Sequence, residues 1–121
     1  MIMAFETSDK DCIFCKIIRG EMPSTTVYQD EDIVVFKDIN PVTPVHLMVV
    51  TRKHFRSLAH MTDAETALVG KMALAAARVA REQGIADQGY RLVINTGPDA
   101  GQVIPHIHAH LMGGRRLRWD H

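Results

Sequence analysis

The most distinctive chemistry in the sequence lies near its C-terminal end, where histidines alternate with apolar residues over 106–112. His106, His108 and His110 are three of the seven histidines in the chain. A two-residue period is typical of a β-strand, so the three imidazoles are predicted to share one face while the apolar side chains take the other. Histidine acts as nucleophile, acid, base or metal ligand, so this concentration indicates a site.

The three histidines are predicted to divide the work between them. In an extended strand the Cα atoms of His106 and His110 lie roughly 13 Å apart. Rings spread over that length converge poorly on one metal ion, whose ligand atoms lie about 2 Å from it. His106 is therefore available for a different site from His110.

A second candidate site is the pair Cys12-x-x-Cys15. This spacing is that of half a tetrahedral zinc site, and His54 and His106 are the natural third and fourth ligands. Two buried apolar cysteines without a metal are the ordinary alternative, and the pair by itself does not decide between them. A thioredoxin-like redox pair is disfavoured, because no strand is predicted before Cys12.

The loop at 95–102 precedes the histidine segment and offers glycines and backbone N–H groups that could cradle a phosphate. Taken alone this indication is weak, since Pro-Asp with glycine usually marks only a turn. Its position beside the histidines favours the phosphate interpretation.

The C-terminal segment 115–119 combines three arginines with Trp119. It could be a solvated basic tail. A tryptophan so close to the end is more typical of packing against this chain or a partner.

The elements that must position these residues follow from pattern and turn signals. A short helix is predicted over 12–20, ending at Gly20, and a long helix begins at the capping box Thr62 to Glu65 and ends near Gly84. Strands are predicted at 25–29, 32–38, 45–50, 90–95 and 104–112. Together these elements predict an α+β domain with a five-stranded antiparallel sheet, one long helix and a short N-terminal helix.

The long helix is apolar over a wide arc. One stripe contains Leu68, Met72, Ala75 and Val79, and its neighbour contains Val69, Ala73, Ala76 and Ala80. The sheet could cover one stripe and a second subunit the other. Alternatively, the small-residue stripe lies close on the helix's own sheet.

Length and composition narrow the function classes. The 121 residues suit one domain that needs no disulfide, and the 14 basic and 14 acidic side chains predict no nucleic-acid partner. The chain lacks a secretion signal at its start and any apolar run of the 18 or so residues that a membrane span needs, so we expect a cytoplasmic protein with no membrane partner. Residues 1–10 are expected to form a flexible N-terminus.

The sequence resembles the histidine-triad (HIT) family, whose signature alternates histidine with an apolar residue, as the segment from His106 to Met112 does. The resemblance covers nearly the whole chain in several independent segments. They are Cys12-Ile-Phe-Cys-Lys-Ile-Ile, Phe36-Lys-Asp-Ile-Asn-Pro, Thr51-Arg-Lys-His, Asn95-Thr-Gly-Pro-Asp-Ala-Gly-Gln and Gly113-Gly-Arg-Arg-Leu-Arg-Trp.

The short length and the ending look most like the Hint branch of purine nucleoside phosphoramidate hydrolases. The resemblance implies a single HIT domain over 1–121 and a homodimer in which the sheet extends across both subunits. It places the tail 113–121 near the dimer interface or the active site. It also resembles bacterial members with structural zinc, held here by Cys12, Cys15, His54 and His106, and it implies no organic cofactor.

The resemblance implies that His108 attacks the α-phosphorus of an AMP phosphoramidate such as an adenylated lysine, forming a nucleotidyl-histidine that water hydrolyses. His110 would bind a phosphate oxygen and His46 would join a proton relay. The purine nucleotide would meet a pocket of Ile13, Phe14 and Ile17 for the base, Asp38 for the ribose, Asn95 and Gln102 for the phosphate, and Phe36, Ile39, Gly101, Val103 and Trp119 around them.

The chain departs from the family at Val103, where serine or threonine is usual and valine can neither donate nor accept a proton. We therefore expect weaker or differently gated turnover. The alternatives are a nucleotide-binding regulatory scaffold with little turnover, and a dinucleoside polyphosphate hydrolase. A metal-dependent enzyme with the triad as ligands is disfavoured, because no carboxylate stands within the triad to complete such a site.

Overall fold

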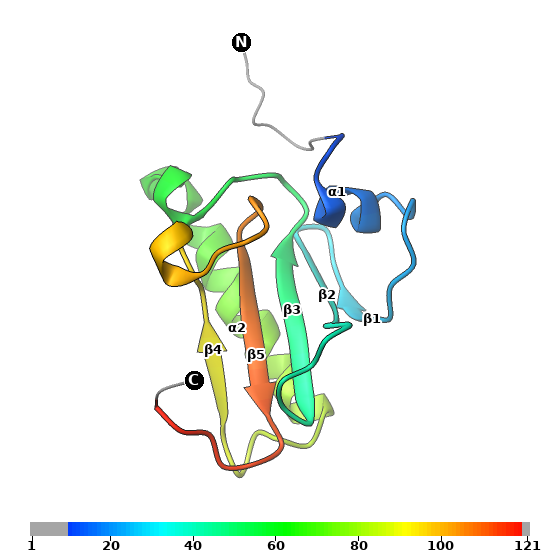
Figure 1. Ribbon diagram of the computed structural model, residues 1–121, viewed down its shortest axis with the longest axis vertical. Helices are drawn as coiled ribbons and strands as arrows, with labels where there is room; N and C mark the ends of the chain where they lie inside the picture. Colours follow the sequence, from blue (N-terminus) through cyan, green and yellow to red (C-terminus); the bar gives the residue numbers. More distant parts are fainter. Residues whose placement is uncertain (1–9, 120–121) are drawn as a thin grey trace.

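A computed structural model describes residues 10–119, which form one antiparallel sheet with two helices (Figure 1). The strands are ordered β1-β2-β3-β5-β4, and in the view of Figure 1 the long helix α2 lies behind the sheet. This confirms the predicted α+β class and its five strands, whereas extension of the sheet across a homodimer stays a prediction. The elements are α1 (Ile13–Ile18), β1 (Thr26–Gln29), β2 (Ile33–Lys37), β3 (Val45–Thr51), α2 (Thr66–Glu82), β4 (Tyr90–Val93) and β5 (His108–Gly113), with 3-10 turns at Leu58–His60, Asp63–Glu65 and Pro98–Ala100.

The two faces of the sheet have different compositions because side chains alternate along each strand. In the β3–β5 pair, Leu47 lies opposite Leu111, and both pack in the core under α2. The next pair along, Met48 and His110, therefore faces the other side. That side is partly covered by α1 and carries a second, smaller apolar cluster of Cys12, Phe14, Cys15, Val34, Phe36, Met48 and Val50.

The fifth strand begins later than predicted, at His108 rather than at Ile104, and it ends at Gly113. Pro105 has no N–H to offer, and the N–H of His106 turns back to the carbonyl two residues earlier, at 2.8 Å. The predicted start of this strand is therefore wrong. The predicted alternation still holds before the ladder begins, because Ile107 is buried under α2 while the ring of His106 is on the α1 side.

Both helices begin and end where local signals predict. Cys12 is the N-cap of α1, and Gly20, at φ +79°, follows the helix in the left-handed region that glycine tolerates best. The capping box of Thr62 and Glu65 is formed, and it opens a 3-10 turn that leads into α2 at Thr66.

Both predicted stripes of α2 contribute to the same core. Met72 from the first stripe and Ala76 and Ala80 from the second are all buried against the sheet. The small residues thus let the helix lie close on its own sheet, which is the second of the two alternatives. Ala73 and Leu74 stay exposed, so the outer surface of α2 is uncovered in the single chain.

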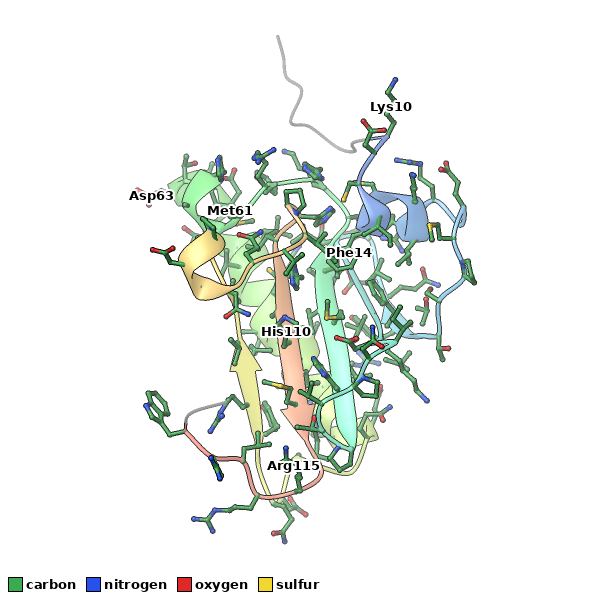
Figure 2. All side chains as sticks on the ribbon, viewed as in Figure 1. Lys10, Phe14, Met61, Asp63, His110 and Arg115 are labelled. Carbon is green, nitrogen blue, oxygen red and sulfur yellow. The ribbon has the colours of Figure 1, made fainter. Side chains whose placement is uncertain are left out.

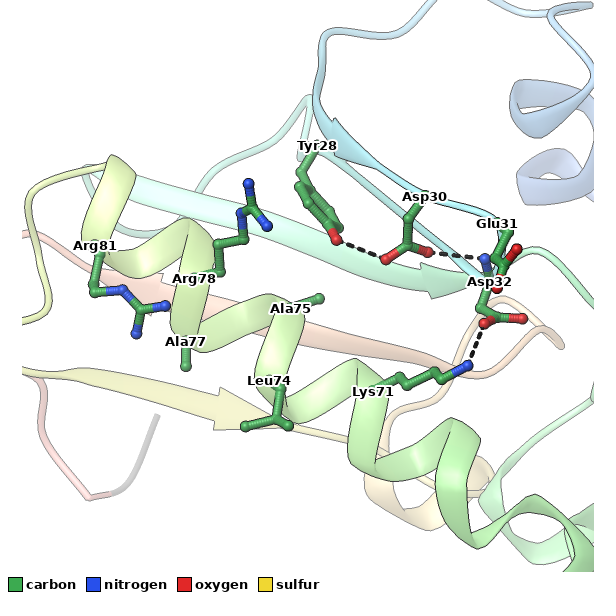
Figure 3. Close-up of a pocket in the computed structure, with 10 residues that line it drawn as sticks. All are labelled: Tyr28, Asp30, Glu31, Asp32, Lys71, Leu74, Ala75, Ala77, Arg78 and Arg81. Carbon is green, nitrogen blue, oxygen red and sulfur yellow. Dashed lines mark hydrogen bonds and ion pairs between the residues drawn. The ribbon is translucent and has the colours of Figure 1, made fainter.

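Side chains of α2 contact residues of β1 and of the β1–β2 turn beside a hollow of about 760 Å³ (Figure 3). Lys71 Nζ pairs with Asp32 Oδ2 at 2.6 Å, and the guanidinium of Arg78 lies 5.2 Å from the ring centre of Tyr28. The hydroxyl of Tyr28 donates to Asp30 at 2.6 Å. Lys71 and Asp32 are thus paired with each other, and none of the described residues that line this hollow is a histidine or cysteine.

Within residues 10–119 no helix has the length and apolar character needed to cross a membrane. The predicted flexible N-terminus falls, apart from Lys10, outside the described residues. The last two residues of the predicted tail also lie outside them.

We expect Ile33→Ala to lower the free energy of unfolding by about 2–5 kcal/mol, because it empties a fully buried position in β2. Ile39→Ala is the matched control, since 87% of that side chain's surface is exposed, and it should change the value by less than about 0.5 kcal/mol. Urea denaturation of both variants measures this. Equal losses would contradict the assignment of the core.

Candidate functional site

A buried group of two cysteines and two histidines lies where α1 meets the segments that flank β3 and β5. We call Cys12, Cys15, His54 and His106 the Cys2His2 cluster, and all four are buried with their ligand atoms within 4.8 Å of one another. The Sγ atoms of Cys12 and Cys15 lie 3.3 and 3.5 Å from Nδ1 of His106. Nδ1 of His54 lies 3.1 Å from the same atom and 3.4 Å from Cys15 Sγ.

These separations fit a tetrahedral metal ion. Ligands about 2.0–2.3 Å from a tetrahedral zinc lie about 3.3–3.8 Å from each other, close to the distances in the cluster. The tautomer of His106 fits as well: its Nε2 lies 2.7 Å from the carbonyl oxygen of Thr51, which can only accept, so Nε2 carries the proton. Nδ1 of His106 therefore presents a lone pair to the centre of the cluster.

His108 is held by the residue two positions before it. Its Nδ1 lies 2.7 Å from the main-chain carbonyl of His106, so Nδ1 carries the proton and Nε2 presents the lone pair. The ring of Phe14 packs edge-on against the His108 ring at 5.1 Å. Burial lowers the pKa of His108, although the carbonyl of His106 and the charge of Asp38 oppose this. A neutral imidazole with a free Nε2 is a nucleophile.

His110 faces a different partner, His46, which lies diagonally across the β3–β5 pair. Nδ1 of His46 accepts the backbone N–H of Val42 at 3.1 Å, so in the neutral ring the proton is on Nε2. That Nε2 lies 2.9 Å from Nδ1 of His110 and 3.3 Å from a carboxylate oxygen of Asp38. His110 Nδ1 therefore accepts, and its own proton is on Nε2. The β5 face thus presents a lone pair at His108 and an N–H donor at His110.

Asp38, His46 and His110 also place three ligand atoms within 4.8 Å of one another. A metal there would need a lone pair on His46 Nε2, which would leave a proton on Nδ1 facing the N–H of Val42. Two donors cannot satisfy each other, so the hydrogen bonds favour a proton relay at this second group.

The environment holds His110 in its neutral form. Burial, followed by the nearby rings of His108 and His46, lowers the pKa of His110 to about 4, against a small opposing effect of Asp38. At neutral pH the ring is therefore a neutral hydrogen-bond donor through Nε2.

A hollow of about 640 Å³ opens beside this pair. It contains His46 and His110, and its wall includes Asn95 and Trp119 from two of the predicted segments. His110, labelled in Figure 2, lies on β5. Trp119 is 93% exposed, so it lies against the hollow without being buried. The other lining residues are Val42, Arg91, Val93, Ala100 and Met112.

The structure brings part of the predicted binding set together. Phe14 packs against Phe36 as well as His108, with ring centres 5.5 Å apart, and both phenylalanines are buried. From α1, Ile13 is partly exposed while Ile17 packs on the smaller apolar cluster. These residues surround the face of the sheet next to His108.

Other predicted binding residues lie in loops, where some of them make local contacts. The amide of Gln102 is engaged by the 95–102 loop and its neighbours, since it accepts from Gly97 N–H and donates to Arg56 and Ile104 carbonyls. Gly101 ends the loop's 3-10 turn at φ +89°. The two largely exposed apolar residues of the set, at 87% each, are Ile39 and Val103.

Sequence reasoning missed Thr51 and Arg91. Thr51 accepts the proton of His106 Nε2 through its main-chain carbonyl, and every residue has such a carbonyl, so the residue type gives no signal. Arg91 lies opposite Met112 in the β4–β5 pair, so it shares a face with His110 two residues away. Pairing β4 with β5 in this register would have found it, but strand order was not available from the pattern.

The chain is similar to known proteins over most of its length. The HIT domain family model matches residues 19–117. The chain is 41% identical over 108 residues to the purine nucleoside phosphoramidase of Escherichia coli K12, covering 89% of this chain and 91% of that protein. It is 42% identical over 113 residues to the 14 kDa zinc-binding protein of Zea mays, covering 92% and 88%. A HIT family hydrolase from Clostridium thermocellum superposes with a TM-score of 0.90 and 40% identity, covering 92% and 96%.

We expect the ring of His110 to stay neutral from pH 8 down to about pH 5, because its pKa is lowered to about 4. The unfolded chain takes up that proton near its ordinary value of about 6.5, so this histidine makes the protein less stable as the pH falls from 6.5 to 4. NMR titration measures the midpoint, with His110→Gln to assign the resonance. A midpoint near 6.5 would contradict the described environment.

Proposed function

Because the chain belongs to the HIT domain family, we propose that it hydrolyses the P–N bond of purine nucleoside 5′-phosphoramidates, with AMP-lysine-like compounds as the substrate class. The observation that carries the proposal is the hydrogen bond from His108 Nδ1 to the carbonyl of His106, which leaves Nε2 as the attacking atom. Similarity to a protein named purine nucleoside phosphoramidase supports the choice of bond.

The proposed reaction has two steps. First, Nε2 of His108 attacks the α-phosphorus, the P–N bond breaks with its electron pair on nitrogen, and the amine leaves after gaining a proton. A nucleotidyl group is then bound to His108 Nε2. Second, water attacks the same phosphorus, the P–Nε2 bond breaks, and AMP leaves with His108 restored.

His110 is proposed to stabilise the charge that develops on the phosphoryl oxygens. Its Nε2–H is a donor fixed by the hydrogen bond that Nδ1 accepts from His46. His46, in turn, lies beside Asp38 and can accept or return a proton as the charge changes. This supports the proton-relay role for His46.

The binding roles are proposals on the same basis. Ile13, Phe14 and Ile17 would contact the base from α1, and Asp38 would hold the ribose hydroxyls. Asn95 would meet the phosphate, since it lines the hollow with His110. The amide of Gln102 is occupied by loop contacts, so we assign it to shaping the loop. Phe36 would support Phe14 from beneath.

Zinc is the proposed occupant of the Cys2His2 cluster, in a structural role. Two thiolates with two imidazoles are a common zinc ligand set, and the similarity to a protein named as zinc-binding agrees with it. Zinc bound there would cross-link α1 to the segments that carry His54 and His106. No organic cofactor is required by the proposed reaction.

A homodimer is proposed through the β4 side of the sheet. In the sheet order β4 is an edge strand, and exposed sheet edges invite pairing with another chain. The exposed Leu74 on α2 adds apolar surface to the single chain.

The exposed Val103 favours a second candidate, a nucleotide-binding scaffold with little turnover. Valine offers no proton to the leaving amine, so that proton must come from water or from the relay of His46 and His110. We therefore expect slow turnover of phosphoramidates whose leaving amines are strongly basic. Tight AMP binding without turnover would favour the scaffold.

We expect His108→Ala to lower kcat for an adenosine phosphoramidate by at least about three orders of magnitude, because it removes the attacking atom. The nucleotidylated protein seen by mass spectrometry in the wild type should vanish as well. His60→Ala is the matched control, since His60 is exposed and bonded only locally to Ser57. Unchanged turnover in His108→Ala would exclude covalent catalysis at this residue.

We expect one zinc ion per wild-type chain and less than a tenth of that in His54→Asn, because a ligand is lost from a closed four-ligand site. His60→Asn makes the same change at an exposed position and should keep its zinc. Elemental analysis of the purified proteins measures both. Equal zinc in the two variants would place the metal elsewhere.

A further inference from the structure

One residue belongs both to the Cys2His2 cluster and to the support of the proposed nucleophile. The side chain of His106 turns Nδ1 toward Cys12 Sγ at 3.3 Å, and its main-chain carbonyl accepts the Nδ1–H of His108 at 2.7 Å. We propose that His106 is a positioning residue, through which a metal in the cluster holds His108 in the tautomer and orientation that present Nε2. The link is a property of the fold, and only its effect on turnover rests on the proposed function.

The main-chain carbonyl of His106, which accepts the Nδ1–H of His108, is not held in place by the sheet. Regular pairing of β5 with β3 begins at His108, opposite Val50, so the peptide unit between His106 and Ile107 lies before the ladder. What orients that peptide is its N–H, which donates to the carbonyl of Phe55 at 2.8 Å. Because the peptide is planar and trans, fixing its N–H also fixes the direction of the carbonyl.

Both anchors of this peptide lead back to the cluster. Phe55 directly follows the cluster residue His54, and His106 is itself a member, 0% exposed. A metal bound by the imidazoles of both His54 and His106 would hold these two residues together. It would thereby fix Phe55, which accepts the Ile107 N–H, relative to the carbonyl of His106. Without it, bonds such as that from the N–H of Ile107 to the carbonyl of Phe55 and that from His106 Nε2 to Thr51 remain, but no metal ion fixes the two imidazoles relative to each other. The direction of the carbonyl is then less constrained.

A second contact runs through α1. Phe14 lies between the two cysteines in the sequence, and its ring packs edge-on against His108 at 5.1 Å and His106 at 5.8 Å between ring centres. A helix of six residues has little stability of its own, so its position depends on its anchors. Binding of a metal ion by Cys12 and Cys15 would therefore also keep Phe14 packed against the ring of His108.

The consequence concerns which nitrogen of His108 carries the proton. While the carbonyl of His106 accepts from Nδ1, the lone pair is confined to Nε2. Once that acceptor moves, either nitrogen can carry the proton and the ring can turn. A metal that merely stabilised the fold would leave the tautomer of His108 unchanged in any molecule that remained folded.

The test compares His54→Asn with His54→Cys, because His54 is a cluster residue on a segment distant in sequence from His108. Long-range ¹⁵N–¹H NMR of the zinc-loaded wild type should show His108 with a protonated Nδ1 alone. In folded His54→Asn we expect a mixture of tautomers and a kcat about 10- to 100-fold lower. His54→Cys, which again offers four zinc ligands, should restore both, and His60→Asn should leave both unchanged.

Folded, zinc-free His54→Asn with the pure wild-type tautomer of His108 would overturn the proposal. If that variant does not fold, zinc is titrated out of the wild type instead, and the tautomer signal must follow zinc occupancy; a signal independent of occupancy also overturns it. A wild type that turns over no nucleoside phosphoramidate would refute the proposed function, while the NMR comparison still decides the coupling.

Discussion

The proposed chemistry of this chain depends on the hydrogen bond between the His108 ring and the carbonyl of His106. A histidine has two nitrogens, and only an acceptor that cannot donate assigns the proton to one of them. Here a backbone carbonyl does so at Nδ1, which leaves the lone pair on Nε2, the atom that is proposed to attack. The protons of two other histidines are assigned in the same way. The carbonyl of Thr51 can only accept, so it places the proton of His106 on Nε2, and the N–H of Val42 can only donate, so it places the proton of neutral His46 on Nε2.

The sheet separates this chemistry from the core that stabilises the fold. On the α2 side, alternate residues of β3 and β5 such as Leu47 and Leu111 are buried among apolar neighbours. On the other side, the same strands present Met48, His108 and His110. Because α1 covers only part of that side, His108 is desolvated by Phe14 while His110 borders an open hollow. One alternating strand thus supplies both the stability and the reactive groups.

Much of this arrangement was predictable from the sequence. Alternation along 106–112 predicts the shared face of the histidines, and the length of the segment predicts that His106 and His110 serve different sites. The capping box at Thr62 and the glycine at Gly20 predict helix ends that depend only on local bonds, and both are confirmed. These features depend on neighbours in the sequence, so the sequence reveals them.

The rest depends on contacts between distant segments. The start of β5 was predicted too early: in addition to the local effects of Pro105 and of the bond from His106 N–H to Ile104, the N–H of Ile107 donates to Phe55, about fifty residues away in the sequence. The approach of His46 to His110 and the place of Arg91 require the strand order and register. Main-chain groups such as the Thr51 carbonyl carry no signal in residue type.

The most direct measurement is the position of phosphorus in the trapped nucleotidyl adduct. Wild-type protein is mixed with an adenosine phosphoramidate, quenched rapidly in alkali, and digested for ³¹P and ¹⁵N NMR. We expect one modified residue, His108, with phosphorus on Nε2. An adduct on Nδ1, or on His110, would contradict the assignment of the nucleophile by the His106 carbonyl.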